Sequence, residues 1–173
     1  MMEREKENGL YALAIERLRE TGVKFTVDSL CKEARLSKKT FYLWYPSKGD
    51  FAKRVYSYAK EETQHAEFSF RQSPTASSLC HYLTWVMNVA MITSKETFNL
   101  YSLHLLLQQE ALALREETRQ AFQKTLLDIF PSSVTSHPSF LIGLEKILCG
   151  LSHENNHEMV LSDLSEVLIS WIH

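Results

Sequence analysis

Residues 26–51 read TVDSLCKEARLSKKTFYLWYPSKGDF, and this stretch organises the interpretation of the whole chain. Thr26 can cap a helix in which apolar residues recur at i, i+3, i+4 and i+7. These apolar residues are Val27, Leu30, Cys31 and Ala34. Because this spacing puts them on one face, the sequence predicts a two-turn helix with a buried side.

A second short helix follows after a break in the pattern. Ser37 offers a cap, and residues 38–44 then run to Tyr45 with Phe41 and Tyr45, four positions apart, facing inward. Two short helices joined by a tight turn, the second capped by Ser and opening with two lysines, are typical of a helix-turn-helix.

The order of residues in this stretch resembles the DNA-binding domain of the tetracycline-repressor (TetR) family. That family's pattern reads roughly T-V-x-x-I-A-x-x-A-G-V-S-x-G-T-L-Y-x-Y-F-x-S-K-x-x-L. The matching run here comprises Thr26-Val27, Ala34, Ser37-Lys38-Lys39-Thr40-Phe41-Tyr42, Tyr45-Pro46-Ser47-Lys48 and Phe51. Two glycines of the pattern are replaced, by Arg35 in the turn and by Lys39 in the second helix. Arg35 raises the cost of a turn that often requires positive φ. The match covers about the first third of the chain.

The resemblance implies an all-α protein with two parts. Residues 1–46 would form a three-helix helix-turn-helix head, and residues 47–173 a helical body for effector binding and dimerisation. The composition agrees with helices, because 173 residues contain only 5 Gly and 4 Pro.

The predicted DNA contacts divide by chemistry. Lys38 and Lys39 can donate to guanine O6 and N7 in the major groove, and Thr40 can meet a base methyl or a phosphate. Tyr42, Trp44 and Lys48 suit a phosphate clamp, and the amides behind Thr26 form a helix N-terminus that favours anions. The full candidate set is Thr26, Ser37, Lys38, Lys39, Thr40, Tyr42, Trp44 and Lys48. The competing interpretation is that these are surface residues of a purely structural bundle.

The charge distribution favours a phosphate-binding segment, although the whole chain has a formal net charge of −2. Residues 24–60 hold nine Lys or Arg against three carboxylates, a net charge of +6. Residues 63–173 hold six against eleven, a net charge of −5. A basic segment that coincides with the helix-turn-helix pattern indicates contact with nucleic acid rather than an ordinary solvated face.

The remaining chain predicts further helices. Ser73-Pro74 opens one, with Pro74 in the first helical position. Residues 96–130 contain no Gly or Pro, so they form one long helix or two broken near Gln108 to Ala111; we favour two. The run at 131–138 predicts a loop.

Two strong apolar stripes occupy the C-terminal third. They exceed what one chain is expected to cover, and the resemblance implies that they pair with a second copy in a four-helix bundle. Ordinary core packing is the alternative. The predicted dimer residues are Phe140, Leu144, Ile147, Leu148, Leu151, Leu161, Leu164, Leu168 and Trp171.

An effector pocket, if present, is expected within residues 73–130. The candidate lining mixes aromatic rings, thioethers and an imidazole, which suits a mostly apolar small molecule with one or two polar handles. The same residue types at helical spacing are more often plain core. The candidates are Trp85, Met87, Met91, Phe98, Tyr101 and His104.

Other functional classes have little support. No nucleophile–base pair, paired carboxylates, glycine-rich phosphate loop, C-x-x-C or H-x-x-x-H occurs, so we expect no enzyme activity, metal or cofactor. Three widely spaced cysteines argue against a disulfide framework and favour the cytoplasm, and no apolar run predicts a membrane span.

The leading hypothesis is a homodimeric transcriptional repressor, released from a palindromic double-stranded operator by a small, mostly apolar ligand. The alternative is a protein–protein interaction module or co-regulator of the same fold, with weak or no DNA binding.

Overall fold

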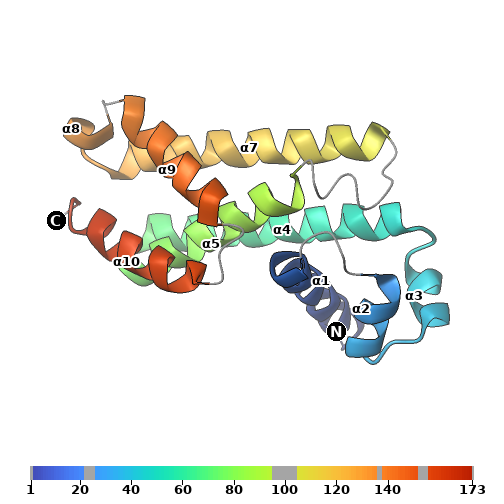
Figure 1. Ribbon diagram of the computed structural model, residues 1–173. Coiled ribbons are helices and arrows are strands. Elements are labelled where there is room, and N and C mark those ends of the chain that lie inside the picture. Colours follow the sequence, from blue (N-terminus) through green and yellow to red (C-terminus); the bar gives the residue numbers. More distant parts are fainter. Residues whose placement is uncertain (1, 22–25, 95–104, 136–137, 152–155, 173) are drawn as a thin grey trace.

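The computed structural model describes residues 2–21, 26–94, 105–135, 138–151 and 156–172, and every element in these ranges is a helix (Figure 1). The predicted all-α class is therefore confirmed for this part of the chain. The helices are α1 (Met2–Thr21), α2 (Val27–Glu33), α3 (Lys38–Trp44), α4 (Lys48–Gln72), α5 (Ala76–Ile92), α7 (Leu105–Ile129), α8 (Ser132–Thr135), α9 (Pro138–Leu151) and α10 (His157–Ile169).

The arrangement places α2 and α3 at one end of the molecule, beside the start of α4, and α8 to α10 towards the other end (Figure 1). The long helices α4, α5 and α7 pack on one another and connect the two ends. Two hydrophobic clusters lie along this framework.

The first, which we call the head cluster, gathers buried residues from α1, α2, α3 and the first half of α4. Phe41 and Phe51 are central to it, with ring centroids 5.1 Å apart, and Tyr45 lies 5.0 Å from Phe51. The end of α5 and the start of α7 complete the cluster. Three helices of this length can bury only a small core, which is why the head shares its core with α4, α5 and α7. The division at residues 46 and 47 stays a prediction, and this cluster continues across it.

The second, which we call the body cluster, lies between the rest of α4 and α5, the second half of α7, and helices α9 and α10. Phe70, Tyr82 and Phe122 form its aromatic centre, with Tyr82 ring centroids 6.1 Å from Phe70 and 5.9 Å from Phe122. Burial of such rings supplies most of the favourable free energy of a small helical core.

A series of ion pairs joins α4 to α7 at a constant offset of 57 residues, and we call it the α4–α7 ladder. Lys60 bonds Glu117 at 2.6 Å and Arg71 bonds Asp128 at 3.0 Å, both with this offset. Lys53 pairs with Glu110 at 3.1 Å in the same register. A constant offset means that the two helices run parallel and in step.

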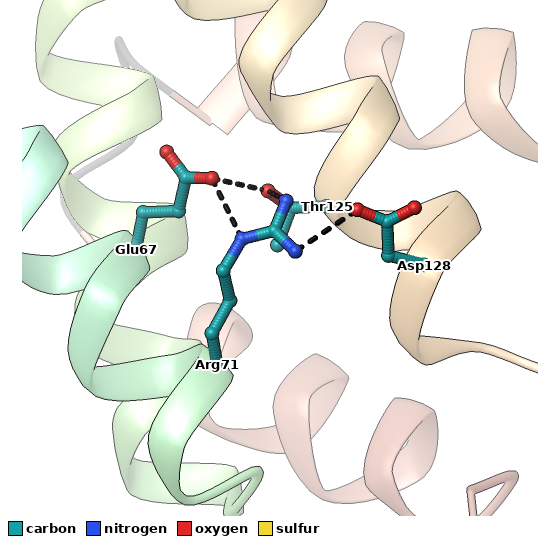
Figure 2. A network of polar contacts seen from close by, with 4 residues as sticks. All are labelled: Glu67, Arg71, Thr125 and Asp128. Atoms are coloured by element: carbon teal, nitrogen blue, oxygen red, sulfur yellow. Dashed lines mark hydrogen bonds and ion pairs between the residues drawn. The ribbon is translucent and has the colours of Figure 1, made fainter.

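The Arg71–Asp128 pair of the α4–α7 ladder belongs to a larger polar network (Figure 2). Arg71 donates from Nε to Glu67 at 2.9 Å and from Nη2 to the Thr125 hydroxyl at 2.7 Å. Thr125 in turn donates to Glu67 at 2.7 Å. Single exposed ion pairs contribute about 0–1 kcal/mol, but a partly buried network holds a geometry more firmly.

Three sequence-based boundaries are wrong. Helix α7 continues through Gln108 to Ala111, because Leu107, Ala111 and Leu114 share one buried face and nothing in the backbone interrupts it. Within the predicted loop, residues 132–135 form the short helix α8. Thr75, rather than a residue before Pro74, caps α5 by accepting from the Ser78 N–H.

Over the residues that can be placed, no helix has the length and apolar character needed to cross a membrane.

Candidate nucleic-acid interface

Side chains fix the start of both short helices. Thr26 Oγ1 accepts from the Ser29 N–H at 3.1 Å, and Ser29 Oγ accepts from the Thr26 N–H at 3.1 Å, which is a reciprocal capping box. Ser37 Oγ accepts from the Thr40 N–H at 3.0 Å. Both predicted caps are therefore present, and each satisfies backbone N–H groups that a helix leaves without an intrahelical partner.

The turn between α2 and α3 is closed by backbone hydrogen bonds around Arg35, whose φ is 52°. The Leu36 N–H reaches the Cys31 carbonyl at 2.8 Å, and the Arg35 N–H reaches the Lys32 carbonyl at 3.3 Å. These two bonds are the Schellman arrangement that ends many helices, usually with glycine at the left-handed position. Arg35 therefore adopts the positive φ that was expected at this position, and the turn forms without a glycine.

Helix α3 presents two different faces. Phe41 is fully buried and Tyr45 nearly so, and Tyr45 donates a hydrogen bond to the Tyr11 hydroxyl at 3.0 Å. Burial is the main cause that raises the pKa of Tyr45. On the other face, Leu43 is 78% exposed and Tyr42 is 44% exposed. The inward anchor thus fixes which side of α3 is available to a partner.

Leu43 was missed by the sequence analysis. The sequence could have indicated its exposure, because Leu43 does not lie on the inward face of the helix that Phe41 and Tyr45 define. Trp44, predicted on the outside, is only half exposed because its ring packs against the head cluster.

The lysines of this region are not equivalent. Lys38 Nζ lies 2.6 Å from Asp28 Oδ2, and the hydrogen bond to Asp28 raises the pKa of Lys38. Lys39 and Lys48 are exposed and form no ion pair with any residue the structure describes. Lys53 and Lys60 belong to the α4–α7 ladder. The basic excess of residues 24–60 therefore overstates the charge that is available to a ligand.

Thr40 is also partly committed, because its hydroxyl lies 2.8 Å from Ser37 Oγ within the cap. On the other side of the unit, Arg17 of α1 donates from Nε to Glu33 at 2.7 Å and so holds α2 against α1. The Arg17 hydrogen bond lowers the pKa of Glu33. The predicted DNA contacts Lys39, Tyr42 and Lys48 remain exposed on the head.

The predicted dimer residues fall into three groups by burial. Leu144, Leu148, Leu161 and Leu168 are buried in the body cluster of the single chain. Phe140, Leu151 and Leu164 are partly buried against it. Ile147 and Trp171 are exposed. Further exposed apolar residues on α9 and α10 are Ile142, Met159 and Val167.

Three of the predicted effector residues are described, and none of them lines the cavity between α5, α7 and α9. Met87 and Met91 are buried in the body and head clusters, and Trp85 packs edge-on against Tyr58 with centroids 5.7 Å apart. Phe98, Tyr101 and His104 lie outside the described residues. A cavity of about 90 Å³ lies instead between α5, α7 and α9, with other residues on its walls.

Within the described ranges, no group of three or more His, Cys, Asp or Glu residues is placed to hold a metal ion. Comparisons of the chain with family models, with curated proteins and with solved structures give no significant match.

Proposed function

We propose that the protein is a DNA-binding transcriptional regulator of the TetR type, acting as a homodimeric repressor of a palindromic operator. The observation that carries the proposal is the two-sided α3: Phe41 and Tyr45 anchor it, and Lys39, Tyr42 and Leu43 face outward. With α2 and the Arg35 turn in front of it, α3 is the recognition helix of a helix-turn-helix that enters the major groove.

Each exposed side chain then has a role set by its chemistry. Lys39 donates to base edges, and Leu43 suits the methyl group of thymine. Tyr42 and Lys48 contact the phosphate backbone and fix the register of the helix. Lys38 is the weaker contact, because Asp28 already holds its ammonium group.

The dimer in this proposal uses the exposed apolar residues of α9, of α10 and of the turn after α10. Ile142, Ile147, Met159, Val167 and Trp171 would be covered by the same residues of a second copy. Two heads would then read half-sites about 34–36 Å apart, which requires a palindromic operator. A ligand in the body that prefers a different spacing of the heads would oppose DNA binding.

The test is selection of duplexes from a random pool, followed by affinity measurements at several salt concentrations. Lys48→Ala should weaken binding to all sequences alike and reduce the salt slope by about one. Lys39→Ala should weaken binding by about 1–3 kcal/mol and also relax the sequence preference. Lys38→Ala should have a smaller effect than Lys39→Ala.

Lys146→Ala removes an exposed lysine from α9 and serves as the matched control. If the unchanged protein selects no sequence, or if Lys39→Ala and Lys48→Ala bind every duplex as it does, the head does not read DNA. The interaction-module alternative would then take its place.

A further inference from the structure

The cavity between α5, α7 and α9 has walls of two kinds. Val86 and Ala90 of α5 and Phe122 of α7 contribute apolar surface. Arg115, Thr118 and Arg119 of α7 and Glu145 of α9 add polar groups. An apolar volume with a few convergent polar groups is the usual composition of a small-molecule site.

Thr118 is 9% exposed, so more than nine-tenths of it is buried, and its hydroxyl makes no hydrogen bond to any residue the structure describes. Other buried threonines behave differently. Thr63 donates to the Ala59 carbonyl at 2.6 Å, and Thr93 donates to the Val89 carbonyl at 2.6 Å. The Thr118 hydroxyl is not among the fully buried polar atoms that lack a partner, so it is reached from the cavity and is available to hydrogen-bond a ligand.

The two arginines at the cavity differ in whether they form ion pairs. Arg119 is held by Glu116 at 2.7 Å and lies 4.0 Å from Glu145. Arg115, three positions before Thr118 and therefore on the same side of α7, forms no ion pair within the described ranges. A hydroxyl donor and an available guanidinium on one side of a helix suit a carboxylate.

We propose that this cavity binds a short-chain aliphatic carboxylate. The carboxylate accepts from Thr118 Oγ1 and from the Arg115 guanidinium, and the alkyl chain lies against Val86, Ala90 and Phe122. A cavity of 150 Å³ accommodates benzene, so about 90 Å³ admits a chain of roughly three to five carbon atoms.

The effect of such a ligand on DNA rests on the proposed function. The cavity borders α7 at Arg115 to Phe122, and this stretch contains Glu117, which the α4–α7 ladder joins to Lys60 of α4. A carboxylate that prefers a shifted α7 therefore shifts α4, and α4 leads directly into the head. The size of the effect on DNA equals the difference in affinity of the ligand for the two positions.

Calorimetric titration of the full chain with propionate, butyrate, pentanoate, hexanoate and octanoate tests the binding itself, without DNA. We expect one site per chain, tightest binding near four to six carbon atoms in total, and octanoate at least about 10-fold weaker because the cavity is too small. Butylamine has a similar chain with the opposite charge and should not bind.

Three variants locate the site. Thr118→Val keeps the shape and removes the hydroxyl, and should lower butyrate affinity about 3- to 10-fold. Arg115→Gln should lower it by a similar factor, and Ala90→Leu should abolish binding by filling the cavity. The matched controls Thr63→Val and Lys124→Gln lie outside the cavity and should stay within about 2-fold of the unchanged protein.

The proposal is overturned if none of the carboxylates binds, or if Thr118→Val and Ala90→Leu bind butyrate as the unchanged protein does. Its failure is distinguishable from failure of the proposed function. Carboxylate binding without any DNA binding would support the ligand site and contradict the repressor function. Sequence-specific DNA binding without carboxylate binding would support the repressor function and contradict the ligand site.

Discussion

The head cluster and the body cluster are both aromatic cores between helices, but their boundaries are set in different ways. Around the head cluster, α2, α3 and α4 each begin at a side-chain cap, from Thr26, Ser37 and Ser47. Around the body cluster, α10 begins at Asn156 without a side-chain cap bond, and its apolar stripe places it instead. Caps therefore set the starts of the short helices of the head, whereas in the body α5 has the Thr75 cap and α10 is placed by packing.

The two regions also differ in what they leave exposed. In α2 and α3, the exposed large apolar residues are Tyr42 and Leu43, both on the outer face of α3. In α9 and α10, exposed apolar residues extend along both helices. Such surfaces are commonly covered by a partner, so the comparison predicts one small recognition face on the head and one broader face on the body.

The largest expected effect separates buried from exposed positions within the body. Val167 is 51% exposed and its neighbour Leu168 is 2% exposed. Leu168→Glu buries an unpaired carboxylate and should cost more than about 3 kcal/mol, enough to unfold the body. Val167→Glu should leave the fold intact and abolish self-association. Circular dichroism and sedimentation measure the two outcomes.

A folded Leu168→Glu variant would mean that α10 packs differently from the arrangement described. A Val167→Glu variant that remains dimeric would move the proposed interface away from this face. Glu158→Gln changes an exposed charge on the same helix and is the control that should affect neither property.

An intermediate effect is expected where the two clusters meet. Asn88 lies on α5 between Met87 of the body cluster and Val89 of the head cluster. Arg19 of α1 donates from Nη2 to Asn88 Oδ1 at 2.6 Å, and its Nη1 lies 3.1 Å from Nε2 of His157 at the start of α10. Asn88→Ala removes the acceptor of a partly buried guanidinium and should cost about 1–3 kcal/mol in urea unfolding.

The unfolding curve of Asn88→Ala carries further information about the comparison. If this bond couples the regions, the single transition should broaden or divide into two, because head and body then unfold separately. Asn8→Ala, at a half-buried position on α1, is the control. An unchanged midpoint and slope for Asn88→Ala would show that the bond contributes nothing to either region.

The difference between the regions explains what could be predicted from the sequence. The head could be predicted because its signals are local: Thr26 and Ser37 are caps, and the strained turn at Arg35 was identified from a missing glycine. The structure of the body was harder to predict. The continuity of α7 through Gln108 depends on burial of Leu107 and Ala111 against other helices, which no local pattern specifies.

Which lysines are available to contact DNA could not be predicted from local sequence either. That Lys38 is held by Asp28, and that Lys53 and Lys60 pair with α7, depends on which helices become neighbours. The body stripes were identified correctly as apolar helices. Which of their residues face the body cluster, such as Leu168, and which remain exposed, such as Ile147, is decided by packing.

The smallest effect at neutral pH is expected from two buried tyrosines, one in each cluster. Burial is the main cause that raises the pKa of Tyr56 in the head cluster to about 12, and burial likewise raises the pKa of Tyr82 in the body cluster. The Tyr56 hydroxyl is buried and has no hydrogen-bond partner among the described residues. Tyr56→Phe should therefore be neutral or stabilising by up to about 1 kcal/mol at pH 7.

The difference appears in alkali. An unfolded tyrosine loses its proton near pH 10, whereas folded Tyr56 keeps it until about pH 12. The unfolded state thus binds fewer protons between these values, so stability is complete below pH 10 and falls as the pH rises through the window. Tyr56→Phe should remove up to about 2 kcal/mol of that fall, measured as the urea midpoint from pH 8 to 11.5. If head and body unfold as one unit, Tyr82→Phe should reduce the same fall in the same transition. If the two regions are independent, each variant should protect only its own transition, and the control Tyr42→Phe should protect neither. A midpoint that falls equally in all of these proteins would show that neither buried hydroxyl governs the alkaline limit.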